Sequence, residues 1–150
     1  EEYEVVVERR SSSQIENDAF RLAEHHVNQT SVKRALESLY RREARETFEE
    51  RTDIHAAEMG VEYDQIHVRN QKTKWGSCSS TGTLSLNWRL IMAPLEIVDY
   101  ILVHELAHLR EPNHSDQFWS LVAEYDPEYE AHAQWLEENS AQLVFSEDDL

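Results

Sequence analysis

The segment from Pro94 to Leu109 constrains the fold of this chain most, because it has the length and apolar spacing of a buried helix and yet carries titratable side chains. A proline suits the first turn of such a helix. On a helical wheel four leucines fall on one side, which predicts a face packed into the core. These are Leu95, Leu102, Leu106 and Leu109. Titratable groups are costly in an apolar setting unless something pairs or coordinates them.

Three polar residues of this segment have the spacing of a zinc-binding helix. His104 and His108 are four positions apart and project from one face, and Glu105 lies beside them. In the H-E-x-x-H pattern the two histidines bind zinc and the glutamate activates the metal-bound water. Catalytic zinc takes three protein ligands and keeps one position open. His114 follows Pro112, which ends the helix and lets the chain reverse, so we expect His114 to be the third ligand.

Other interpretations of this pattern remain open. The full spacing H-E-x-x-H-x5-H is that of metzincins, but Glu111 stands where a metzincin has glycine and no Met-turn follows, so that fold is not implied. A glutamate from the following segment is an alternative third ligand. The candidates are Glu124, Glu128 and Glu130. The simplest alternative is that the histidines bind no metal at all.

Chain length, net charge and cysteine content limit the classes of protein to which this chain can belong. With 150 residues the chain predicts a single domain, residues 1–150. Its net charge is −16 and it has only three lysines, which is typical of halophilic proteins and argues against general nucleic-acid binding. The single cysteine, Cys78, excludes an internal disulfide and fits a cytoplasmic protein. We find no signal peptide and no run of 18 apolar residues, so we expect no membrane span.

The remaining patterns predict an α+β domain. Residues 66–71 and 83–88 are two alternating segments separated by a turn at Ser79–Gly82, which indicates a β-hairpin. Its inward side chains are Leu84, Leu86 and Trp88, with Thr83, Ser85 and Asn87 on the other face. We expect an N-terminal segment at 1–60 and a peptidase core at 61–145. Predicted elements outside the hairpin are a strand at 3–10 and helices at 14–27, 30–60, 94–109, 115–125 and 126–142.

Three stretches closely resemble the YgjP-like metallopeptidase family, which is related to the SprT-like group of zinc proteases. They are Lys72–Pro94 (KTKWGSCSSTGTLSLNWRLIMAP), Val98–Leu109 (VDYILVHELAHL) and Asn113–Trp119 (NHSDQFW). The resemblance extends over about residues 66–136 and includes PEYEAHAQWL, which begins at Pro127.

This resemblance implies a zincin-like fold, with a small sheet or hairpin packed on the zinc-binding helix and with C-terminal helices. It also implies a peptide or protein substrate, one Zn²⁺ per chain and Glu105 as the catalytic residue. The implied metal ligands are His104, His108 and His114.

The stretch KTKWGSC concentrates positive charge on an otherwise acidic chain. A hairpin ahead of the zinc helix offers an edge strand for an extended substrate peptide. We therefore expect substrate contacts, or in a DNA-associated protease contacts to a nucleic-acid backbone, from Lys72, Lys74, Trp75 and Asn87. The alternative is that WGSC is a structural corner.

Two functions of different class follow. The first is zinc-dependent hydrolysis of peptide bonds through a Glu-activated, zinc-bound water. The alternative is a zinc-stabilised interaction module, with little activity, in a nucleic-acid-associated or protein-quality-control complex.

Peptide hydrolysis also needs a side chain that stabilises the oxyanion, and the candidates are Tyr125, Tyr129 and His132. The other histidines, predicted to lie on the surface, are His25, His26, His55 and His67.

Overall fold

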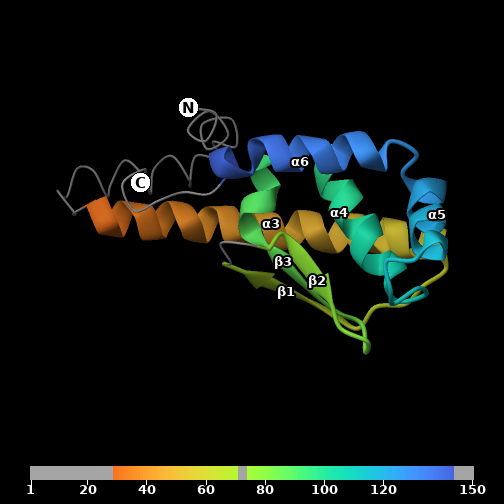
Figure 1. The fold of residues 1–150 in the computed structure, drawn as a ribbon. Coiled ribbons are helices and arrows are strands. Elements are labelled where there is room, and N and C mark those ends of the chain that lie inside the picture. The colour runs from red at the N-terminus through yellow and green to blue at the C-terminus, as the bar shows by residue number, and fades with distance from the viewer. Residues whose placement is uncertain (1–28, 71–73, 144–150) are drawn as a thin grey trace. The chain divides into compact units, whose positions relative to one another are not determined.

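A computed structural model describes residues 29–70 and 74–143 (Figure 1). In these ranges helices are combined with a small three-stranded sheet, which confirms the predicted α+β class. The predicted strand at 3–10 and helix at 14–27 lie outside the described residues. The elements are α3 (Gln29–Met59), β1 (Gln65–Arg69), β2 (Gly76–Cys78), β3 (Thr83–Asn87), the 3₁₀-helix η1 (Trp88–Met92), α4 (Leu95–Ala107), α5 (Asp116–Tyr125) and α6 (Tyr129–Leu143).

The chain divides into two compact units, residues 1–40 with 145–150 and residues 41–144. The second unit contains the sheet, α4, α5, α6 and the part of α3 that begins at Arg41. This part of α3 contributes Ala44, Phe48 and Met59 to the buried side chains. The predicted single domain, with a peptidase core at 61–145, stays a prediction.

The long helix α3 ends where its sequence predicts. Gly60 adopts a positive φ of 69°, a conformation that costs glycine little. Its amide donates to the carbonyl of Ala57, and the amide of Val61 donates to Ala56. These two bonds satisfy carbonyls that the end of a helix leaves free, in the arrangement of a Schellman cap.

The sheet has the order β1-β3-β2, which differs from the predicted pairing. β1 pairs in parallel with β3, whereas the antiparallel hairpin is formed by β2 and β3 around the turn at Ser79–Gly82. The predicted hairpin between residues 66–71 and 83–88 is therefore wrong, although the turn and both alternating strands are present. β2 has only three residues, which is too short to show an alternating pattern in the sequence. The parallel strands β1 and β3 are joined by a crossover connection, and β2 is part of that connection.

The alternation predicted for β3 holds until the strand ends. Leu84, Leu86 and Trp88 are fully buried. Asn87 was placed on the opposite face, but it is buried as well because the chain turns directly into η1. Its side chain accepts a hydrogen bond from the amide of Arg89 and so caps this helix.

Helix α4 lies at the centre of its unit and contacts β2, η1, α5 and α6. It is buried on almost every side, and Leu102 and Leu106 are fully enclosed. The prediction that Leu95 shares this environment is wrong, because the first turn of the helix leaves it 49% exposed. Although α4 is apolar, none of the helices in the described ranges is long and apolar enough to cross a membrane.

An ionic contact joins α3 to α4. Asp99 accepts two hydrogen bonds from the guanidinium of Arg51, at 3.0 and 2.8 Å, and its Oδ1 lies 2.9 Å from Nε2 of His55. The prediction that His55 lies on the surface is wrong, since this contact buries it. Burial alone would raise the pKa of Asp99, but the hydrogen bonds from His55 and Arg51 outweigh it, so the pKa lies below its usual value.

Replacing Asp99 by asparagine is expected to lower the free energy of unfolding by about 1–3 kcal/mol at pH 7, as for other hydrogen bonds to charged groups. A depressed pKa means that the ionised carboxylate stabilises the fold above about pH 4 and loses this effect as the pH falls through the folded-state pKa. Denaturant unfolding at pH 7 and at pH 3 measures this difference, with the exposed Glu46→Gln as control. An equal loss at both pH values would contradict the ionic role of Asp99.

Candidate metal centre

The turn that follows α4 brings a third histidine back to the helix. His108 is the C-terminal cap of α4, and the amide of Glu111 still donates to Ala107 at 2.9 Å. The chain then reverses, and the Ser115 hydroxyl accepts from the amide of Phe118 to begin α5. The two helix ends thus hold the intervening loop, which carries His114.

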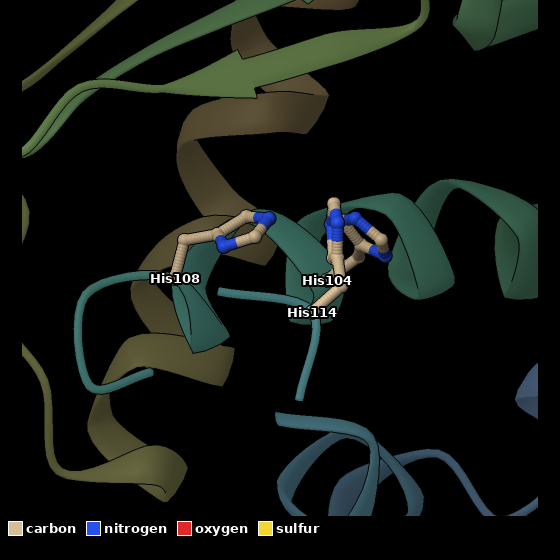
Figure 2. Close-up of side chains that lie close together, drawn as sticks. All are labelled: His104, His108 and His114. Atoms are coloured by element: carbon tan, nitrogen blue, oxygen red, sulfur yellow. The ribbon is translucent and has the colours of Figure 1, made fainter. Parts of the chain in front are cut away.

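The three predicted histidines gather in one place. Figure 2 shows His104 and His108 projecting from α4 and His114 from the loop. One ring nitrogen of each histidine lies within 4.8 Å of the others. The ring centroids are 5.2 Å apart for His104 and His108, and 4.7 Å apart for His108 and His114. The alternative third ligands Glu124, Glu128 and Glu130 are not part of this group, which is the one candidate metal cluster in the described part of the chain.

Two aromatic side chains of α5 enclose this cluster. Phe118 is fully buried, and its ring centroid lies 4.5–5.0 Å from the rings of all three histidines. Trp119 stacks on His114 at 5.8 Å, with an angle of 24° between the ring planes. These contacts limit the rotation of the imidazoles and exclude water from one side of the cluster.

The electrostatic state of the cluster suits a metal. Burial and then the neighbouring histidines lower the pKa of His104 to about 4. Burial and then His114 also lower the pKa of His108, although hydrogen bonds with the backbone of Glu111 and Pro112 act to raise it. Both imidazoles are therefore neutral at pH 7, and only the neutral ring has a lone pair for a metal.

The hydrogen bonding of His104 is also consistent with a ligand. Its Nδ1 is fully buried and makes no hydrogen bond to any residue in the described ranges. A buried polar atom without a partner costs free energy, and coordination of a cation by this nitrogen would offset that cost. The three imidazoles form a group that could hold one metal ion, and a tetrahedral zinc ion held by three histidines would keep one position open.

Glu105 lies beside the cluster, on the side of β2. It is only 7% exposed, and burial raises its pKa to about 7, with Lys74 acting in the opposite direction. At Gly76 the strand approaches α4 closely, because an added Cβ would lie 3.4 Å from Cγ of Glu105 and 3.3 Å from Ile101. A glycine here lets β2 cover the carboxylate.

The stretch KTKWGSC divides into exposed and structural residues. Lys72 lies outside the described residues, Lys74 is exposed, and Trp75 is half-buried with its carbonyl accepting from the amide of Asn87 at 3.0 Å. The buried Asn87 side chain donates to the carbonyl of Lys74 at 3.1 Å. The side-chain amide of Asn87 therefore holds the segment that leads into β2. Burial and then Glu105 raise the pKa of Cys78 to about 11, which keeps the thiol protonated at neutral pH.

The opposite side of the cluster contains a residue that sequence analysis missed. Tyr100 lies one helical turn before His104, with ring centroids 5.9 Å apart. Its spacing of four residues from His104 was the available signal. His132, one of the three side chains considered for oxyanion stabilisation, contacts Tyr100, with ring centroids 6.2 Å apart. Tyr129 stacks on Trp119 instead, at 5.3 Å.

Comparisons with known proteins agree with this geometry. A family model described as the YgjP-like metallopeptidase domain matches residues 1–139. The metallopeptidase zymogen abylysin of Pyrococcus abyssi is similar in structure, with a TM-score of 0.55, 26% identity, and coverage of 61% of this chain and 93% of that chain. The zymogen jannalysin of Methanocaldococcus jannaschii has a TM-score of 0.55 at 23% identity, over 61% and 95%, which shows the fold alone. A search of curated proteins found no match.

Proposed function

Because the chain belongs to the YgjP-like metallopeptidase family, we propose that it is a zinc-dependent peptidase with Glu105 as its general base. The metal ligands in this proposal are His104, His108 and His114. The observation that carries the proposal is the convergence of three ring nitrogens within 4.8 Å, together with a buried glutamate, Glu105, that follows His104 in the helix and is not one of the group. Zinc sites of purely structural type are closed by a fourth protein ligand, whereas catalytic sites keep one position open.

The residues present account for the proton transfers of peptide hydrolysis. A bound zinc ion supplies Lewis-acid activation of water and of the scissile carbonyl. Glu105 accepts a proton as water adds to the carbonyl carbon, and it passes that proton to the leaving nitrogen as the C–N bond breaks. The immediate products are a carboxylic acid and an amine, which become a carboxylate and an ammonium group when the second proton of the water moves from the acid to the amine, and Glu105 returns to its ionised form.

The position of β2 supports binding of an extended peptide. Among the described strands β2 lies at an edge of the sheet, and it packs against α4 next to Glu105. An edge strand pairs with an extended chain through its backbone groups. In this proposal a peptide or unfolded protein segment lies along β2, and the exposed Lys74 contacts a substrate carboxylate or carbonyl.

The competing proposal is a zinc-stabilised interaction module with little activity. It accounts for the histidines but assigns no role to Glu105, whose burial raises its pKa and therefore disfavours its ionised form in the folded protein. A carboxylate kept at that cost beside three histidines favours catalysis.

The purified chain is expected to cleave an unfolded protein such as denatured casein. Cleavage should fall to the uncatalysed background after dialysis against a chelator and return when about one equivalent of Zn²⁺ per chain is added. Product peptides are identified by mass spectrometry, and magnesium alone serves as the control because it prefers oxygen ligands. Cleavage that persists without metal would contradict the proposal.

A further inference from the structure

The wall of the site formed by α6 contains an ordered polar pair. His132 Nδ1 lies 2.9 Å from Oδ2 of Asp126, and only 19% of the His132 side chain and 11% of the Asp126 side chain are exposed. Asp126 caps the C-terminus of α5, where its amide donates to Val122 at 2.8 Å. The carboxylate therefore has a fixed position and orients the imidazole.

Tyr100 lies between this pair and the histidine cluster. Its ring centroid is 5.9 Å from that of His104 and 6.2 Å from that of His132. The residue is only 6% exposed, so its ring has little freedom to rotate. Both neighbours belong to helices that contact one another, which fixes the tyrosine relative to the cluster.

The hydroxyl of Tyr100 has no structural use in the described part of the chain. It makes no hydrogen bond to a residue there, and it is not among the side-chain atoms there that are both fully enclosed and unpaired. The hydroxyl therefore remains available to donate a hydrogen bond to a ligand.

We propose that the Tyr100 hydroxyl donates a hydrogen bond to the carbonyl oxygen of the scissile peptide as negative charge develops on it, with Asp126 and His132 as positioning residues. This inference rests on the proposed peptidase function. A phenol is a neutral donor at pH 7. A donor that is already in place when the charge develops stabilises the transition state more than the bound substrate.

Tyr100→Phe is the test variant, because it removes the hydroxyl and keeps the ring against His104 and His132. We expect kcat to fall about 10²–10³-fold, as for other oxyanion donors, with KM within about threefold and an unchanged zinc content. Affinity for a phosphonate peptide, whose charged oxygens mimic the tetrahedral transition state, should fall with kcat/KM, whereas affinity for the product peptide should not. Tyr63→Phe, which removes a hydroxyl that donates to Asp53 and is not part of the site, is the matched control.

The positioning role has a separate test. Asp126→Asn is expected to lower kcat by a smaller factor than Tyr100→Phe, and to have no further effect in a Tyr100→Phe background. Additive effects would contradict action through Tyr100.

The outcomes separate this inference from the proposed function. Tyr100→Phe with wild-type kcat and phosphonate affinity overturns the inference, while an inactive Glu105→Gln in the same assay leaves the peptidase function standing. Loss of zinc in Tyr100→Phe overturns it too, since the role is then structural. Wild-type protein that neither cleaves peptides nor binds the phosphonate overturns both.

Discussion

Glu105→Gln is expected to lower kcat by about 10²–10⁴-fold, the contribution typical of a general base. The amide has almost the same shape as the carboxylate but cannot accept the proton of the attacking water. Zinc content should not change, because Glu105 is not part of the histidine cluster. Initial rates on a quenched fluorescent peptide, measured beside zinc content, separate a catalytic defect from loss of metal.

The stability of this variant provides an internal control. Burial raises the folded-state pKa of Glu105 to about 7, so ionisation of this residue opposes folding as the pH rises from about 4.5 through 7. The neutral glutamine avoids this cost, and metal-free Glu105→Gln should be at least as stable as the wild type at pH 8. Glu96→Gln, an exposed substitution on the same helix, should change neither rate nor stability appreciably. Full activity of Glu105→Gln would favour the interaction-module alternative.

His114→Ala is expected to weaken zinc binding by more than about 100-fold, since even the loss of a residue that only orients a ligand costs about 10–100-fold. His114 is exposed, so its removal leaves the core intact. Competition with a chelating dye measures the affinity, and thermal unfolding gives a second readout because bound metal stabilises the folded state. A chelator should lower the Tm of the wild type and have little effect on the variant.

The matched control is His67→Ala, which removes a histidine of β1 that contacts Arg69 and is not part of the cluster. It should bind zinc as tightly as the wild type. If His114→Ala also binds zinc with wild-type affinity, the third ligand is another residue.

Local patterns in the sequence were sufficient for the helices and for the grouping of the histidines. The end of α3 at Gly60 and the start of α5 at Ser115 each depend on hydrogen bonds within a few residues, which a single sequence displays. The same holds for His104 and His108, whose spacing is a property of one helix, and for His114, which needs only a short reversal.

Features that depend on distant packing were predicted less well. The parallel pairing of β1 with β3 and the burial of His55 against Asp99 join segments whose contact has no local signature. The prediction for Leu95 was wrong because a helical wheel gives the direction of a side chain around the helix axis. It does not show how far along the helix the neighbouring elements extend, and Leu95 is exposed. For Tyr100 the four-residue spacing from His104 was a local signal, but the contact with His132 of α6 is a matter of distant packing.

X-ray absorption spectroscopy of the zinc-loaded protein tests the central claim most directly, because it reports the atoms bound to the metal. The account predicts three imidazole nitrogens and one further light atom at about 2.0–2.1 Å, and no sulfur at about 2.3 Å. A sulfur atom would implicate Cys78, and a spectrum with two imidazoles or fewer would remove at least one of the three histidines from the site. Either result would contradict a three-histidine zinc centre with an open position.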